Sequence, residues 1–260
     1  MITKAVFDNL ITRARIKKYS SLNYADFDDC QNAEILIDEK QFILLINRSK
    51  TPNMLYFATD DFVEVVAKTK EIAEALRLHF VPKEYAGQLK AVGFVEWGEF
   101  ADFWNYDLAK TIAEFSDMEE PVFLKPEEFE AAATVTKSCA LQSRGFEGVE
   151  PEFFAEWLQD GNEVLVQRVD GKVVGVCCIS IYNAGTTVWI REIAVDPDYQ
   201  GKGFGKKLLK QVLKYGTEHG AVKAFLAADI LNRNAIGLYQ KCGFQMQADE
   251  SELQMVRNEE

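Results

Sequence analysis

Three glycines at alternate positions, Gly201, Gly203 and Gly205, could do chemistry because they separate a β-rich run from a segment of helical periodicity. A helix N-terminus offers unpaired N–H groups and about half a positive charge, which suits a phosphate group. Glycines at this place let a phosphate approach the backbone, and Lys202 and Lys206 add positive charge beside it. The pattern favours a site for a phosphate-bearing ligand, although a glycine turn without a ligand, before a basic helix face, would show the same sequence pattern.

Two well-known phosphate loops do not fit these residues. A Walker loop has a hydroxyl residue after its lysine, and Lys207 stands in that place after Lys206. A dinucleotide-binding loop reads GxGxxG early in a βαβ unit, whereas the glycines here read GxGxG and follow segments typical of an antiparallel meander. Both classes are therefore excluded.

The elements around the glycines must position them. Alternation and turn residues predict a meander of three strands, at Glu163–Val169, Val173–Tyr182 and Thr186–Val195, with a hairpin turn at Asp170-Gly171. Periodicity predicts the other elements of this half, which are a short strand at Pro121–Leu124, helices at Pro126–Leu141 and Glu152–Leu158, a helix at Lys202–Glu218, a strand at Val222–Ala228, a helix at Asn234–Lys241 and a β segment from Phe244. We expect an α/β (α+β) fold with a mixed, mostly antiparallel sheet flanked by helices.

Composition narrows the class of protein. The chain has 260 residues, of which 48% are hydrophobic and 27% charged, and a net charge of −12. This balance is typical of a globular protein, and the acidic excess argues against nucleic acid as a partner. Cationic small molecules or basic peptides suit an acidic surface better, although net charge also serves solubility alone. Apolar runs are only strand-sized and the first twenty residues lack a signal-peptide core, so we expect no membrane partner and a cytoplasmic location.

The five cysteines are scattered along the chain and form no CxxC pair. Cys177 and Cys178 are adjacent within a predicted strand, so their side chains should point to opposite faces. We expect buried free thiols and no metal site.

The glycine segment and its neighbours resemble a known family. Gln200-Gly201-Lys202-Gly203-Phe204-Gly205 is similar to the Q/R-x-x-G-x-G/A acyl-CoA loop of GNAT acetyltransferases. The segment from Arg191 to Pro197 resembles the fourth strand of that family, and the segment from Asn232 to Phe244 resembles its second CoA-binding segment. The three motifs occur in the family's order within residues 121–260.

The resemblance implies acetyl-CoA as cosubstrate and no metal. In the family, loop amides hold the pyrophosphate of CoA, and the splayed end of the fourth strand pairs with the pantetheine arm. A backbone N–H near Val195 would polarise the thioester carbonyl, as an oxyanion-hole donor does. Carried onto this sequence, the cofactor-binding residues are Ile193, Ala194, Val195, Gln200, Gly201, Lys202, Gly203, Phe204, Gly205, Lys206 and Asn232.

The resemblance also implies two catalytic residues. Glu192 stands where family members often carry a carboxylate that accepts the amine proton, directly or through water; a pair with Arg191 or with a lysine across the sheet is the alternative. Tyr239 corresponds to a tyrosine beside the thioester sulfur and would be the acid; packing on the sheet is its alternative. For Asn232, local turn capping is the alternative to contact with pantetheine.

The implied function is an acyl-CoA-dependent N-acetyltransferase that transfers an acetyl group directly to a primary amine of a small molecule, an amino acid or a peptide. The alternative is a CoA-binding sensor or structural protein without turnover. Acceptor contacts are expected from the loop over Gln142–Gly148, with Ser143, Arg144 and Phe146 as candidates.

The N-terminal half shows a weaker form of the same order. An acidic, proline-containing stretch at residues 116–129 predicts a junction, and hence domains at residues 1–118 and 119–260. Strand-like runs at Ala33–Ile37, Phe42–Asn47 and Asn53–Ala58, helical periodicity over Asp60–Leu76, and the match of LKAVGF at 89–94 to YQKCGF at 239–244 indicate a divergent GNAT-like domain or a coincidence.

The N-terminal half also lacks a counterpart of the glycine loop. Thr59-Asp60-Asp61 occupies the place of the loop, and its carboxylates would repel a pyrophosphate, so we expect no acyl-CoA binding there. Its aromatic tail should pack on the C-terminal domain and line an acceptor pocket; it comprises Trp97, Phe100, Phe103, Trp104 and Tyr106.

Overall fold

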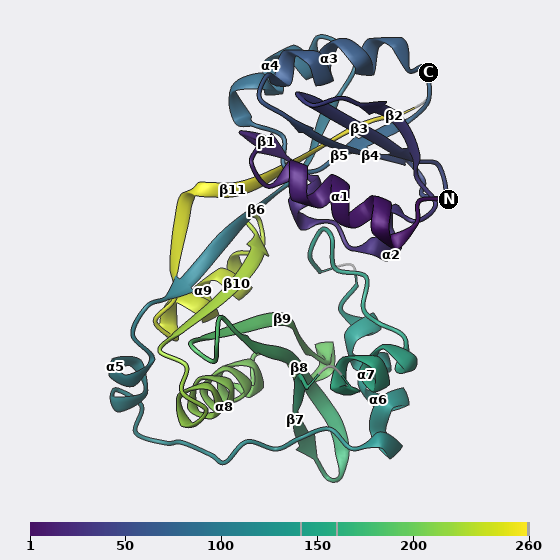
Figure 1. Cartoon of the computed structure of the whole chain (residues 1–260). Helices are drawn as coiled ribbons and strands as arrows, with labels where there is room; N and C mark the ends of the chain where they lie inside the picture. Colours follow the sequence, from purple (N-terminus) through teal and green to yellow (C-terminus); the bar gives the residue numbers. More distant parts are fainter. Residues whose placement is uncertain (141, 160, 259–260) are drawn as a thin grey trace. The chain divides into compact units, whose positions relative to one another are not determined.

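The computed structural model describes residues 1–140, 142–159 and 161–258. It divides into two compact units: unit 1 is Met1–Glu99 with Glu252–Glu260, and unit 2 is Phe100–Ser251. Both units have strands between layers of helices, as Figure 1 shows. The predicted class of fold, a mixed and mostly antiparallel sheet flanked by helices, is confirmed.

Unit 2 contains the meander that the sequence predicts. Its strand order is β7-β8-β9-β10-β6, in which β7, β8 and β9 are antiparallel neighbours, β10 is parallel to β9, and β6 is antiparallel to β10. The elements are β6 (Val95–Asn105), α5 (Leu108–Ala113), α6 (Phe129–Ser138), α7 (Pro151–Gln159), β7 (Glu163–Val169), β8 (Lys172–Tyr182), β9 (Thr187–Val195), α8 (Phe204–Glu218), β10 (Lys223–Asp229), α9 (Arg233–Lys241) and β11 (Gln245–Arg257).

Two predicted elements in this half differ most from the structure. The expected strand at Pro121–Leu124 is a single bridge, Phe123 to Leu165, supported by backbone hydrogen bonds from Leu124 to Val164 and from Val166 to Val122. The helix expected over Pro126–Leu141 is a 3-10 turn followed by α6, which ends at Ser138. Leu141, its predicted last residue, lies outside the described residues.

Both faces of the unit 2 sheet are covered by apolar helix faces. Leu208, Leu209 and Val212 of α8 pack with β8 and β9 on one face, together with Tyr239 of α9. Ala132 and Val135 of α6, with Phe154 of α7, pack on the other face. Cys177 and Cys178 are buried on opposite faces as free thiols, and the expectation of core packing for them is confirmed.

Unit 1 repeats the layering with shorter elements. Its strand order is β2-β3-β4-β5-β11, and β1 pairs with β4. Helices α1 and α2 cover one face, and α3 and α4 cover the other. The elements are α1 (Lys4–Ala14), β1 (Tyr19–Ser20), α2 (Phe27–Cys30), β2 (Glu34–Asp38), β3 (Phe42–Asn47), β4 (Asn53–Thr59), α3 (Phe62–Glu71), β5 (Leu76–Leu78) and α4 (Ala86–Lys90).

The helix predicted over Asp60–Leu76 is wrong at its end. Helix α3 stops at Glu71, and Leu76 begins β5, which runs parallel to β4. Apolar residues continue at helical spacing into this segment, so periodicity alone does not separate the helix from the strand.

Strands β6 and β11 belong to both units. Phe100–Asn105 of β6 pairs with β10 inside unit 2, and Met255–Arg257 of β11 pairs with β5 inside unit 1. The boundary of the compact units therefore lies within β6 and not at the predicted junction near residue 118. The physical reason is that Phe100–Asn105 pairs with β10 and Leu108 packs in the unit 2 core, whereas composition marks only the exposed linker.

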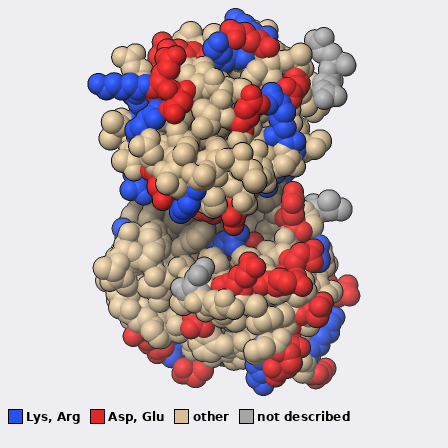
Figure 2. All heavy atoms as spheres, turned by 45° about the vertical axis from the view of Figure 1, so that its right-hand side comes forward, with Lys and Arg blue, Asp and Glu red and all other residues tan. Residues whose placement is uncertain are grey.

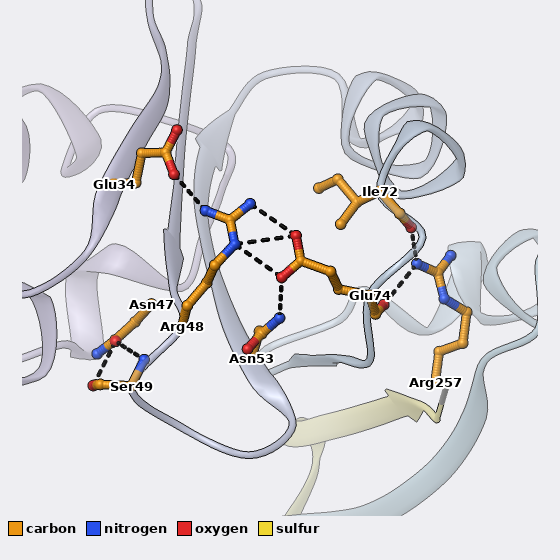
Figure 3. A network of polar contacts seen from close by, with 8 residues as sticks. All are labelled: Glu34, Asn47, Arg48, Ser49, Asn53, Ile72, Glu74 and Arg257. Carbon is orange, nitrogen blue, oxygen red and sulfur yellow. Dashed lines mark hydrogen bonds and ion pairs between the residues drawn. The ribbon is translucent and has the colours of Figure 1, made fainter. Parts of the chain in front are cut away.

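The end of β11 is anchored in unit 1 by Arg257 (Figure 3). Its guanidinium donates to the backbone carbonyls of Thr69, Ile72 and Glu74, and it lies over the Phe94 ring. The Glu74 carboxylate in turn accepts from Arg48, whose hydrogen bond holds the pKa of Glu74 below its usual range. Unit 1 thus depends on a strand from the far end of the sequence.

Strand β1 occupies an edge of β4 that β5 leaves open. The pairing of β4 with β5 covers Asn53–Leu55, while Tyr19–Ser20 pairs with Ala58–Thr59. Because β3 lies along the other edge of β4, β1 must be on the same edge as β5. The Ser21 N–H donates to the Phe57 carbonyl, and the Phe57 N–H donates to Ser21 Oγ, both at 3.0 Å.

Candidate active site

Strands β9 and β10 diverge in unit 2 and leave a cleft between them. Their parallel pairing covers Thr187–Trp189 and Lys223–Phe225. Arg191 then forms a bulge, since Glu192 lies opposite Cys178 and Ile190 lies opposite Ile179. A bulge bends a strand and increases its twist. Beyond it, a cleft of about 880 Å³ is lined by residues 190–195 of β9 and 226–229 of β10.

The glycine segment forms one wall of this cleft. Gly201 and Gly203 have φ of +72° and +89°, and Gly203 caps the N-terminus of α8. A Cβ at either position would meet no heavy atom of the described residues within 4 Å, so the backbone there is open to a ligand. Gly205 differs, because its Cβ would lie 3.0 Å from Leu238 Cδ2, so this glycine permits close packing of α8 on α9.

Most residues predicted to bind the cofactor line the cleft together. They are Ile193, Ala194, Val195, Gln200, Gly201, Gly203, Phe204, Gly205, Lys206 and Asn232. Lys202 is not among the lining residues: its ammonium donates to the Asp198 carbonyl at 2.8 Å and lies over the Tyr199 ring. The Gln200 side chain donates to the Val195 carbonyl at 2.9 Å and to Gln142 Oε1 at 2.7 Å, so it ties the loop to the end of β9.

Glu192 presents a carboxylate to the cleft from the bulge of β9. Its Oε2 is buried and has no hydrogen-bond partner among the described residues. Burial raises the pKa of Glu192, and the nearby charge of Arg191 opposes that shift. The alternative of a close ion pair is not what the structure shows, because the Arg191 guanidinium lies over the rings of Phe153 and Trp157, 4.5 Å and 5.2 Å from their centroids.

Tyr239 reaches the cleft from α9 and is 6% exposed. Its ring also packs edge-on against Phe103 and Phe244 in the core, so the packing alternative holds for the ring. Burial, with a smaller contribution from Cys177, raises the pKa of Tyr239 far above its usual value. The hydroxyl therefore keeps its proton at neutral pH, as an acid requires.

Asn232 caps a helix and also lines the cleft. Its side chain caps α9 by accepting from the Ala235 N–H at 3.2 Å, and the residue also lines the cleft. The capping contact fixes the direction of α9 and thereby the position of Tyr239.

The loop after α6 closes the cleft on the side of β10. Ser143, Arg144 and Phe146 all line the cleft. Arg144 forms two side-chain hydrogen bonds to the buried carboxylate of Asp229, Nε to Oδ2 at 2.8 Å and Nη2 to Oδ1 at 2.5 Å. Arg144 is thus tied to Asp229 and is not a solvated loop residue.

Asp229 and Cys139 also line the cleft, although neither was predicted as a site residue. Asp229 stands at the end of β10, and Cys139 donates its thiol to the Val195 carbonyl at 3.2 Å. Phe100 of β6, which belongs to the aromatic tail, also lines the cleft. A charged residue at the end of a buried strand was the only sequence signal for Asp229, since its partner Arg144 is 85 positions away.

Among residues 1–140, 142–159 and 161–258, no three or more His, Cys, Asp or Glu side chains gather as a metal site would require. Within the same ranges, no helix combines the length and apolar character that crossing a membrane demands.

Sequence comparison gives this cleft a family context. Residues 129–244 match the profile of the "Acetyltransferase (GNAT) family". An uncharacterised N-acetyltransferase of Methanocaldococcus jannaschii is 33% identical over 100 residues, which cover 36% of this chain and 44% of that protein. Spermine/spermidine N(1)-acetyltransferase of Bacillus subtilis is 32% identical over 87 residues, which cover 31% of this chain and 57% of that protein. The matches thus span about half the length of these relatives.

Structure comparison extends the likeness to the whole chain. An acetyltransferase from the GNAT family of Colwellia psychrerythraea superposes with a TM-score of 0.65 at 11% identity, covering 99% of this chain and 98% of that one. A functionally unknown conserved protein of Staphylococcus epidermidis gives a TM-score of 0.58 at 13% identity, covering 92% and 100%. At these identities the likeness establishes the fold.

Proposed function

Residues 129–244 form a GNAT acetyltransferase domain, and from this premise we propose that the cleft of unit 2 binds acetyl-CoA and transfers its acetyl group directly to a primary amine. The observation that carries the proposal is the convergence of three features on one cleft. These are the open edge of β9, the glycine loop before α8, and the side chains of Glu192 and Tyr239.

Acetyl-CoA fits the two walls of the cleft. The pyrophosphate would accept hydrogen bonds from backbone N–H groups of the loop, where Gly201 and Gly203 leave room and α8 supplies its positive end. Lys206 adds positive charge from the first turn of α8. The pantetheine arm would lie along Ile193–Val195 as an added strand, because this edge of β9 has diverged from β10.

The reaction follows from the placement of the two proton-carrying groups. The amine nitrogen attacks the thioester carbonyl carbon, a C–N bond forms, and the C–S bond breaks. Glu192 takes the proton from the amine, directly or through water, and Tyr239 gives its hydroxyl proton to the departing sulfur. Holding the two reactants together supplies most of the rate, and a backbone N–H near Val195 stabilises the developing oxyanion.

Relatives support an amine acceptor without identifying it. Besides the spermine/spermidine enzyme, the chain is 28% identical over 85 residues to streptothricin acetyltransferase of Streptomyces lavendulae. We propose a small-molecule, amino-acid or peptide amine as the acceptor, and a CoA-binding protein without turnover as the second candidate. The release of free thiol from acetyl-CoA across a panel of amines separates the two: acceptor-dependent thiol supports the enzyme, and none supports the second candidate.

We also propose that unit 1 is a divergent GNAT-like domain without an acyl-CoA site. Its order of elements parallels that of unit 2, and the two segments with matching sequence, residues 89–94 and 239–244, make the same turn. Phe94 N–H donates to the Leu89 carbonyl and Phe244 N–H donates to the Tyr239 carbonyl, both at 3.1 Å. The intervening Gly93 has φ of +90°, close to the +83° of Gly243 in the other turn.

Strand β1 fills the place in unit 1 that corresponds to the pantetheine slot of unit 2. It pairs with the diverged end of β4, and Asp60 beyond that end accepts from Lys17 Nζ at 2.7 Å and from the Lys18 N–H at 3.1 Å. Calorimetric titration of the whole chain should therefore give one acetyl-CoA per chain. A second site, or a site that remains after the unit 2 loop is blocked, contradicts this proposal.

A further inference from the structure

The charge of the acceptor can be inferred from the side chains that line the cleft. The charged ones are Arg144, Arg191, Glu192, Lys206 and Asp229. Lys206 lies beside the glycine loop, in the part that the proposed function gives to the cofactor. The other four must match the charge of the acceptor.

Arg144 already has a carboxylate partner inside the protein. Besides its two side-chain bonds, its backbone N–H donates to Asp229 Oδ2 at 3.2 Å. Burial acts to raise the pKa of Asp229, yet the hydrogen bonds from Arg144 and from the Leu231 N–H hold that pKa below its usual range. The Asp229 carboxylate thus stays ionised and compensates the guanidinium.

Arg191 is held by aromatic rings on its side of the cleft. Phe153 and Trp157 of α7 both lie under its guanidinium, and the Trp157 indole N–H donates to the Glu163 carbonyl at 3.2 Å, which fixes the ring. A cation stacked in this way is directed toward α7. In contrast, Glu192 Oε2 has no hydrogen-bond partner among the described residues, so this carboxylate lacks the close pairing that Asp229 has with Arg144.

The surface beside the cleft is acidic as well. Glu147, Glu152 and Glu156 are exposed on the connection after α6 and on α7. Figure 2 shows Asp and Glu side chains gathered on the part of unit 2 that carries these helices. Such a surface attracts cations and repels anions as they approach.

From these contacts we propose that the acceptor is a cationic amine with no carboxylate next to the reacting nitrogen, such as an aliphatic or aralkyl amine, and that Arg144 and Asp229 enforce this choice. The inference rests on the proposed function. An acceptor carboxylate would have to displace Asp229 from Arg144 or lie beside Glu192, and both cost free energy.

The test compares acceptors that differ only at the carboxyl group. Phenethylamine, phenylalaninamide and phenylalanine form one series, and ethylamine, alaninamide and alanine form a second. With acetyl-CoA saturating, thiol release should give kcat/KM per unprotonated amine at least about tenfold higher for the amine and the amide than for the acid, because like charges disfavour the acid. The amide separates the effect of charge from that of bulk.

Equal kcat/KM for acid and amide overturns the inference and leaves the proposed function in place. If no amine releases thiol above the rate without acceptor, diamines and peptides included, the proposed function fails and the inference fails with it.

Variants test whether the Arg144–Asp229 ion pair causes the preference for the amide over the acid. Asp229→Asn keeps the shape of the side chain but leaves the Arg144 guanidinium without its carboxylate partner. The ratio of kcat/KM for the amide to kcat/KM for the acid should therefore decrease. The double variant Asp229→Asn/Arg144→Gln should restore the amide-to-acid ratio of kcat/KM. If the Arg144–Asp229 pair were merely structural, the variants would lower turnover of all acceptors alike. Acetyl-CoA titration of each variant verifies folding. A selective loss of acid turnover in Arg191→Gln would show that Arg191 binds the carboxylate, which also overturns the inference.

Discussion

Burial acts on Glu192 and Tyr239 in the same direction but with different chemical results. For each side chain it raises the pKa, because the charged form is poorly solvated. A carboxylate with a raised pKa is a stronger base, and a phenol with a raised pKa keeps the proton that it must donate. In the proposed reaction the two residues therefore suit opposite roles, Glu192 as acceptor of the amine proton and Tyr239 as donor of a proton to the sulfur.

The pH dependence of turnover should reflect Glu192. Only its ionised form accepts a proton, so kcat/KM should rise with pH, with a midpoint above that of an ordinary carboxyl group. Tyr239 should cause no loss between pH 6 and 9, since its pKa lies far higher. Profiles of the wild type and Glu192→Gln, measured with an acceptor of low amine pKa, test this. Coincident profiles would show that another group is the base.

Tyr239→Phe should lower kcat by ~10–100-fold, at or just below the usual contribution of one acid–base group. Affinity for acetyl-CoA should stay the same, because the proton is transferred only during the reaction. Phe keeps the ring contacts with Phe103 and Phe244, so folding should be preserved. Steady-state kinetics with calorimetry decides the point, and an unchanged kcat across pH 6–9 removes Tyr239 from the mechanism.

Glu192 should also cost stability at neutral pH. Its pKa is higher in the folded than in the unfolded chain, so the folded state binds more protons and the free energy of unfolding falls as pH rises through that range. Glu192→Gln should therefore raise Tm at pH 8 relative to the wild type and lose this advantage at pH 4. Thermal melts at the two pH values measure it, and a lower Tm of the variant at pH 8 would contradict the assignment.

Prediction from sequence worked best for residues whose role depends on the backbone. The glycines of the loop and the end of β9 line the cleft, because the local sequence determines both the turn and the strand. Asp229 and Cys139 were missed because each acts through a contact with a residue distant in sequence. Lys202 shows the converse: its position within the motif is right, but its side chain turns to Asp198.

At the scale of elements, unit 2 was predicted more fully than unit 1. Strong alternation and the turn at Asp170-Gly171 located β7 and β8 within a residue. Strands β1 and β5 are two and three residues long, too short to show a period, and they are held by pairing with β4. Pairing partners of this kind are not encoded in local sequence.

The start of α8 offers a test of the glycine loop. Gly203→Glu should abolish acetyl-CoA binding, because its side chain would place a carboxylate where the pyrophosphate approaches. Gly171→Glu is the matched control: Gly171 also has a positive φ, +80°, and open space around its Cβ position, but it lies in the β7–β8 turn. Both variants carry similar backbone strain, ~1–2 kcal/mol. Calorimetry with unchanged affinity for Gly203→Glu, or with equal loss in both variants, would refute the assignment.

On the scale of the whole molecule, the shared strands decide how the chain can be divided. A chain of residues 119–260 lacks Phe100–Asn105 of β6, so β10 loses its antiparallel neighbour and Tyr239 loses its contact with Phe103. We expect this chain to be poorly soluble or to lose acceptor turnover, because an unpaired strand edge favours aggregation.

Residues 100–251 form the matched comparison, since they keep the compact unit intact. This chain should fold and bind acetyl-CoA better than residues 119–260. Circular dichroism, light scattering and calorimetry on the two chains measure the difference. The expectation fails if residues 119–260 remain soluble and acetylate the acceptor as well as the whole chain does.

The anchoring of Arg257 in unit 1 sets the order in which the protein is completed during its synthesis. Arg257 bonds to the Thr69 carbonyl, 188 positions earlier in the sequence. At ~5–20 residues per second, a ribosome adds those residues in roughly 10–40 s, during which β5 lacks its outer neighbour. Unit 2 has all its strands once residue 251 has emerged. The unit that is translated first therefore cannot complete its sheet before the last residues of β11 are made.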